Sequence, residues 1–123
     1  TEIESILDGV KNVYQHRFII SVFEPHRYSR VLSLKKEFAK SFKKSNLVLL
    51  CPIYGAGEKK NSKFSAIELG KLISKYSKTQ VIIIKDYKEI EKFFKKNLIS
   101  NEIIIGMGAG SISKYMRGLE NIL

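Results

Sequence analysis

Apolar residues along the chain follow two alternating spacings, one typical of helices and the other of buried strands. In one set of segments apolar residues recur every three or four positions, which is the spacing of a helix face. These predicted helices cover 3–13, 31–42, 67–76, 87–98 and 112–122. Between them lie short runs that are apolar almost throughout, at 18–23, 47–51, 80–84 and 102–105. Such continuous runs predict strands that are buried on both faces.

The alternation of strands with helices predicts the fold class. A strand followed by a helix and then by a further strand is typical of parallel sheets, and the crossovers between such strands are right-handed. We therefore expect an α/β protein with a single doubly wound, mostly parallel sheet and helices on both faces, which is a Rossmann-like arrangement. The 123 residues fit one domain, 1–123. No apolar run approaches the roughly 20 residues that a membrane-spanning helix needs.

Local signals indicate where two helices begin and where the single thiol lies. Thr1-Glu2-Ile3-Glu4 matches the capping-box pattern, so the first helix starts at the first residue. A chain that opens on a helix cap is expected to be cut from a longer protein. The third helix is expected to begin near Ser62 or Ser65. The lone Cys51 ends an apolar run and predicts a buried thiol, which fits a cytoplasmic protein.

The formal net charge of +10 raises the question of nucleic-acid binding. Most of the positive charge comes from lysines on the predicted helix surfaces. No helix carries Arg, Asn or Gln in a pattern suited to reading bases, and no strand carries stacking aromatics. We therefore interpret the lysines as a solvated basic face, and nucleic-acid binding is not favoured.

The sequence lacks the motifs that would indicate a metal site, a P-loop or a catalytic triad. The two histidines and one cysteine match no metal-site spacing, so no metal site is predicted. The chain has no G-x-x-x-x-G-K-[ST] motif for a nucleoside triphosphate, and no Ser-His-Asp arrangement can be assembled. No catalytic residue is therefore predicted, and the chain is not expected to catalyse a reaction alone.

Three cationic or potentially cationic residues, His26, Arg27 and Arg30, lie where the first strand ends and a helix begins. A helix N-terminus carries partial positive charge, so each cation there costs about 0.3–1 kcal/mol. The carboxyl ends of parallel strands are also where ligands bind in α/β proteins. These residues therefore predict a site for an anion, either a carboxylate or a phosphate. The alternative is that the arginines pair with surface carboxylates such as Glu24 or Glu58.

Two glycine-containing segments are expected at the same edge of the sheet. Residues 53–58 belong to a long loop after the second strand, and 106–110 form the predicted turn after the fourth. The second segment is a weak match to a dinucleotide fingerprint, because Ser111 occupies the place of its third glycine. Two interpretations remain. The segment is a tight turn that lets a ligand or another domain come close to its backbone, or it is a turn with no role beyond connecting strand and helix. The candidate cleft residues are Tyr54, Glu58, Gly106, Gly108 and Gly110.

The order and spacing of three strings resemble one family. The strings are Phe23-Glu24-Pro25-His26-Arg27-Tyr28-Ser29-Arg30, Ile53-Tyr54-Gly55-Ala56-Gly57-Glu58 and Met107-Gly108-Ala109-Gly110. Together they resemble the C-terminal domain of the Mur ligases, and within that family the UDP-N-acetylmuramate–L-alanine ligases. The resemblance covers essentially all of the chain, and its specific part is His-Arg-Tyr-Ser-Arg.

The resemblance implies a cytoplasmic three-domain enzyme of peptidoglycan synthesis. An N-terminal domain for the UDP-sugar and a central domain for ATP and Mg2+ would lie outside this chain, which is expected to hold no cofactor itself. The partners implied are L-alanine, UDP-N-acetylmuramate, ATP and the other domains, with no membrane. The family reaction forms an acyl phosphate that the alanine amine attacks.

The same resemblance assigns His26, Arg27 and Arg30 to the alanine carboxylate. Ser111 stands where the family usually has aspartate, which leaves its role open. Without the other domains the chain is expected to be inactive. The alternatives are a sister Mur ligase for another amino acid or a peptide, and a stand-alone module that binds a small anion or nucleic acid.

Overall fold

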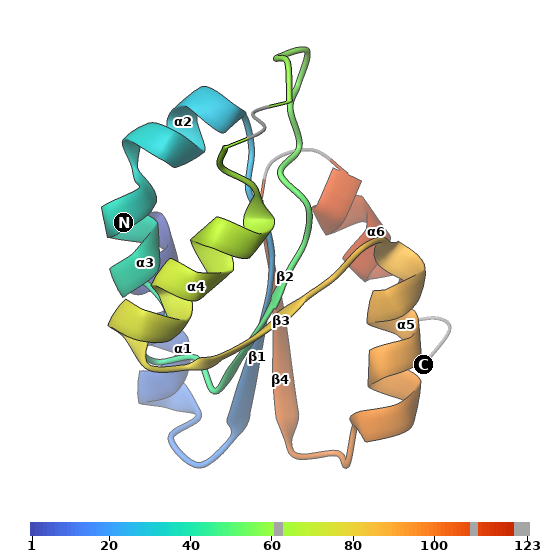
Figure 1. Cartoon of the computed structure of the whole chain (residues 1–123). Helices are drawn as coiled ribbons and strands as arrows, with labels where there is room; N and C mark the ends of the chain where they lie inside the picture. Colours follow the sequence, from blue (N-terminus) through green and yellow to red (C-terminus); the bar gives the residue numbers. More distant parts are fainter. Residues whose placement is uncertain (61–62, 109–110, 120–123) are drawn as a thin grey trace.

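The computed structural model describes residues 1–60, 63–108 and 111–119, which form one sheet with helices on both faces (Figure 1). The predicted α/β class is confirmed. In chain order the elements are α1 (Glu2–Val13), β1 (Phe18–Glu24), α2 (Tyr28–Ser33), α3 (Lys35–Lys40), β2 (Leu47–Leu50), α4 (Ala66–Ser77), β3 (Gln80–Ile83), α5 (Tyr87–Asn97), β4 (Glu102–Gly108) and α6 (Ser111–Leu119).

The sheet has the strand order β3-β2-β1-β4, and every neighbouring pair is parallel. Strand β1 is therefore central, with Phe23 opposite Leu50 of β2 on one side and Met107 of β4 on the other. Because all strands run the same way, their carboxyl ends meet at one edge of the sheet. The residues that follow β1 lie at that edge, between the ends of β2 and β4.

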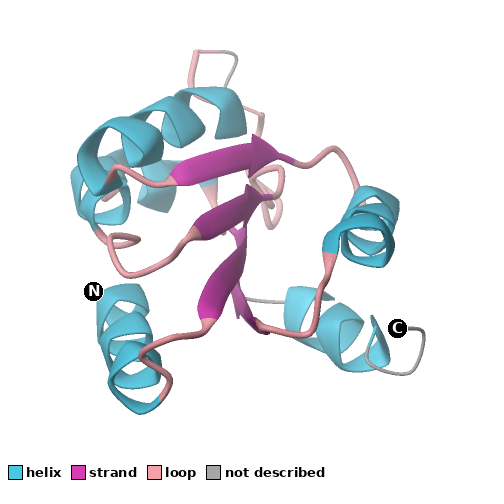
Figure 2. Cartoon of the chain, turned by 90° about the horizontal axis from the view of Figure 1, so that it is seen from below, coloured by secondary structure: helices cyan, strands magenta, loops and turns pink. Residues whose placement is uncertain are grey.

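Helices cover the two faces unequally (Figure 2). One face packs against α1, α2, α3 and α4, and the other against α5 and α6. Each face has its own apolar core, and the residues that fill them are mostly fully buried. The first core includes Leu7, Ile19, Val31, Phe42 and Leu69, and the second includes Val22, Leu49, Ile90, Phe94 and Ile112. Burial on both faces explains the continuous apolar runs of β1 and β2, whereas the edge strands β3 and β4 are only partly buried.

The segment predicted as one helix over 31–42 forms two short helices. The break falls at Leu34, whose φ of −107° and ψ of 16° lie outside helical geometry. The hydrogen bonds from Leu34 N to Arg30 O and from Phe38 N to Leu34 O still span the break. The bend keeps Val31 and Phe38 in the same core, so the apolar spacing looked continuous in the sequence.

The fourth strand is longer than predicted, because β4 continues through Gly106 and Gly108. These glycines are therefore strand residues, and the prediction that they form a turn is wrong. Gly106 is needed for close packing: a Cβ there would lie 2.7 Å from Cγ of Met116 in α6. Gly110 falls outside the described residues.

The predicted helix starts are confirmed where the structure describes them. Thr1 caps α1, with its hydroxyl accepting a hydrogen bond from Glu4 N at 3.2 Å. Helix α4 begins with a capping box in which Ser65 and Glu68 satisfy each other's backbone groups. The alternative start at Ser62 lies outside the described residues. Among the helices that the structure describes, none is long and apolar enough to cross a membrane.

Candidate functional site

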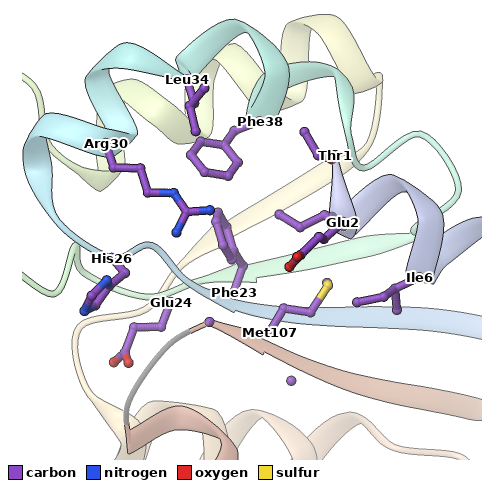
Figure 3. Close-up of a pocket in the computed structure, with 13 residues that line it drawn as sticks. Thr1, Glu2, Ile6, Phe23, Glu24, His26, Arg30, Leu34, Phe38 and Met107 are labelled. Carbon is purple, nitrogen blue, oxygen red and sulfur yellow. The ribbon is translucent and has the colours of Figure 1, made fainter.

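A pocket of about 570 Å³ opens at the carboxyl edge of the sheet, beside the ends of β1 and β4 (Figure 3). The start of α1 and the helices α2 and α3 form its other walls. Most of its lining is apolar, contributed by Ile3, Ile6, Phe23, Leu34, Phe38 and Met107. Its polar side chains are Thr1, Glu2, Glu24, His26 and Arg30, and the backbones of Gly106 and Gly108 complete the lining.

Two of the predicted anion-binding residues line this pocket. Arg30 extends from α2 toward Phe23, and His26 comes from the segment that directly follows β1 (Figure 3). Within the described ranges Arg30 forms no ion pair. A guanidinium above an apolar floor suits a ligand that combines an anionic group with a small apolar body, because arginine binds carboxylates through two parallel hydrogen bonds.

Arg27 lies outside the pocket lining. Arg27 precedes α2 as its N-cap residue with a φ of +67°, so it is not part of the helix that carries Arg30. Its Nε lies 3.3 Å from Oε2 of Glu58, and over half of its side chain is exposed. The pairing with Glu58, which the sequence left open as an alternative, is therefore present for Arg27.

Glu58 places a carboxylate of the chain itself at the start of this helix. Its carboxylate accepts hydrogen bonds from the backbone N of Ser29 at 2.9 Å and from Ser29 Oγ at 2.6 Å. These bonds, more than the nearby Arg27, lower the pKa of Glu58 from its usual 4.5. An acidic side chain of the chain itself thus stabilises the first turn of α2.

The loop after β2 packs directly against the site. Arg27 N donates to Tyr54 O at 2.7 Å and Tyr54 N donates to Pro25 O at 2.8 Å, forming an isolated parallel bridge. The ring of Tyr54 also stacks on His26, with centroids 5.5 Å apart. The prediction that Tyr54 and Glu58 lie at the same edge as the cationic cluster is therefore confirmed.

Glu24 is buried and belongs to a polar network that the sequence did not reveal. Tyr87 at the start of α5 donates its hydroxyl hydrogen to Glu24 Oε2 at 2.7 Å, and the same hydroxyl lies 2.8 Å from Ser111 Oγ. Glu24 Oε1 is buried and has no hydrogen-bond partner in the described part of the chain. Burial and the bond to Glu24 raise the pKa of Tyr87 to about 12. No local sequence signal joins residues so far apart in the chain.

Cys51 is a free thiol with no exposed surface, as predicted. Burial, with a smaller contribution from the charge of Glu24, raises the pKa of this thiol to about 12. The thiol is therefore protonated at neutral pH and is a packing residue. Across residues 1–60, 63–108 and 111–119, no group of three or more His, Cys, Asp or Glu residues lies close enough to hold a metal ion.

Gly108 brings the end of β4 against the polar network. Its φ is +143°, and a Cβ there would lie 2.5 Å from the carbonyl oxygen of Glu24. Gly108 and Gly106 both line the pocket.

Comparison with curated proteins finds relatives over the whole chain, although no protein-family model matches it. The chain is 44% identical over 123 residues to a UDP-N-acetylmuramate–L-alanine ligase of Pelagibacter ubique, and the match covers 100% of this chain and 26% of the relative. It is 38% identical over 111 residues to the ligase of the same name from Caldanaerobacter subterraneus, covering 90% of this chain and 24% of the relative. The chain thus spans about a quarter of the length of these relatives.

A solved structure has a similar fold. The crystal structure of a murein peptide ligase from Psychrobacter arcticus matches with a TM-score of 0.73 over 97% of this chain and 24% of that chain. At 17% identity, the likeness concerns the fold alone.

Proposed function

We propose that this chain, a C-terminal domain of the Mur ligase family, binds the amino acid that the full-length ligase joins to UDP-N-acetylmuramate. The observation that carries the proposal is the pocket at the carboxyl edge of the sheet, where Arg30 and His26 lie above an apolar floor. An amino acid such as L-alanine has the two features that this pocket suits, a carboxylate and a small apolar side chain.

In this proposal Arg30 and His26 bind the alanine carboxylate, and Arg27, the residue after His26, completes the cationic set. Fixing the carboxylate restricts the direction in which the amine points, so the amine is aimed at the activated muramoyl carboxyl group. The contribution of this chain to the reaction is then orientation.

The remaining parts of the reaction belong to other domains in this proposal. The described residues offer no cluster of metal ligands, and the sequence has no phosphate-binding loop of the P-loop type. ATP and Mg2+ would be held mainly by the central domain of the full-length ligase, and UDP-N-acetylmuramate by its N-terminal domain. This chain would close over both.

The proposal is tested by replacing Arg30 in the full-length ligase that contains this chain. Arg30→Ala is expected to raise the KM for alanine about 10- to 100-fold, because hydrogen bonds between charged groups contribute about 1.5–3 kcal/mol. The KM values for ATP and UDP-N-acetylmuramate should change little. Initial-rate kinetics with each substrate varied in turn measure all three.

Lys36→Ala is the matched control, because Lys36 is an exposed cation on the neighbouring helix α3 and does not line the pocket. It should leave the KM for alanine unchanged. An Arg30→Ala ligase with the alanine KM of the parent enzyme would contradict the proposed role of this pocket.

A further inference from the structure

The contact between Arg27 and Glu58 leaves most of the guanidinium available. Glu58 pairs with Nε, the nitrogen nearest the side-chain stem, at 3.3 Å. The two terminal nitrogens of Arg27 have no hydrogen-bond partner among the residues that the structure describes. A guanidinium offers carboxylates a two-pronged face made by its terminal nitrogens, and that face is still free here.

Glu58 itself is held without help from Arg27. Ser29 donates two hydrogen bonds to its carboxylate, and Glu58 N donates to Gly55 O at 3.0 Å. The turn is tightly packed, because a Cβ at Gly55 would lie 3.0 Å from Glu58 O and 3.3 Å from the ring of Tyr28. Glu58 is therefore a fixed point against which a long, exposed arginine can be oriented.

The backbone of Arg27 is fixed from the same loop. Its φ of +67° is uncommon for a residue with a side chain, and the bond from Arg27 N to Tyr54 O at 2.7 Å holds it there. Arg27 directly follows His26, which lines the pocket, so its backbone is fixed one residue away from the pocket lining. Loop 54–58 thus holds both ends of Arg27, the main chain through Tyr54 and the guanidinium through Glu58.

We propose that Glu58 is a positioning residue, which holds Arg27 by Nε so that its terminal nitrogens can receive the carboxylate of the incoming amino acid. This inference rests on the proposed function of the site. Glu58 lowers the conformational freedom that Arg27 would otherwise lose on binding, and such preorganisation strengthens binding. The opposite role would be that of a competitor, in which the Glu58 carboxylate occupies the place of the substrate carboxylate.

The test is Glu58→Gln in the full-length ligase. The amide keeps an oxygen that can accept from Ser29 N but loses the charge that attracts Arg27. We expect the KM for alanine to rise about two- to fivefold, as suits an exposed ion pair, with kcat and the KM for ATP nearly unchanged. Glu91→Gln is the matched control, because it also removes one charge from a surface ion pair, that with Lys95, far from the pocket. It should leave the KM for alanine unchanged.

A double-mutant cycle separates positioning from a general effect on the fold. If Glu58 acts through Arg27, Glu58→Gln should have no further effect on the alanine KM in an Arg27→Ala background. An equal rise in both backgrounds would overturn the proposal, and so would a lower or unchanged alanine KM in the single variant. The Arg30→Ala variant distinguishes failure of the Glu58 role from failure of the proposed function. If it raises the alanine KM while Glu58→Gln does not, only the role of Glu58 is refuted. If it leaves the alanine KM unchanged, the proposed function fails, and this inference fails with it.

Discussion

At the scale of single residues, the least expected feature is the buried carboxylate of Glu24. It ends the central strand, and among the described residues its side chain accepts one hydrogen bond, from Tyr87. A buried carboxylate without partners is costly, so the hydroxyl of Tyr87 is needed for the stability of this edge of the sheet. The same edge carries the pocket, so the network also supports the site.

Tyr87→Phe is predicted to lower the free energy of unfolding by about 1–3 kcal/mol, because neither oxygen of the buried Glu24 side chain would then have a donor among the described residues. Urea unfolding of this chain, followed by circular dichroism, measures the loss. The control is Tyr76→Phe, which removes a hydroxyl from a tyrosine that is 45% exposed on α4 and should change stability by less than about 0.5 kcal/mol. Equal stability of the two variants would show that the bond to Glu24 contributes nothing.

The sequence predicted the position of a site residue only where that residue lies close after the end of a predicted strand. His26 and Arg30 were placed at the carboxyl edge because they directly follow the first apolar run, and the structure has them there. Arg27 also lies between the first strand and α2, but its positive φ could not be predicted, because no glycine marks it. The bond between Tyr87 and Glu24 joins residues 63 positions apart, and no spacing rule reaches that far.

At the scale of elements, the close packing of β4 against β1 fixes the shape of the pocket. Strand β4 pairs with β1 along its whole length, up to Gly108 opposite Glu24. The sequence predicted this strand but ended it at Ile105, because glycine is rare in strand interiors. The strand can continue through Gly106 and Gly108 because they lack side chains. This leaves room for Met116 beside Gly106 and for the backbone of Glu24 beside Gly108.

Gly108→Ala is predicted to destabilise the chain by about 1–3 kcal/mol or more. The positive φ is strained for alanine, and the added Cβ would lie 2.5 Å from a backbone oxygen that cannot swing away. The matched variant is Gly9→Ala in α1, where a Cβ meets nothing within 4 Å and helix propensity favours alanine. Thermal unfolding should show a lower midpoint for Gly108→Ala and an equal or higher one for Gly9→Ala. The reverse order would contradict the packing described here.

At the scale of the whole molecule, the fold was predictable because each strand segment is a nearly continuous apolar run and each helix segment carries apolar residues at helical spacing. Those two patterns repeat along the chain, and they determine a parallel sheet covered by two layers of helices. The order β3-β2-β1-β4 brings the ends of β1 and β4 together, and this alone places Arg30 and His26 beside Gly106 and Gly108. The pocket is thus a consequence of topology as much as of its residues.

The proposed function is tested most directly by a crystal structure of the full-length protein that contains this chain, with UDP-N-acetylmuramoyl-L-alanine bound as the proposed product. The account predicts that the alanine carboxylate lies within hydrogen-bond distance of the Arg30 guanidinium, beside His26, at the carboxyl edge of this sheet. A product carboxylate bound elsewhere, with Arg30 directed into solvent, would contradict it.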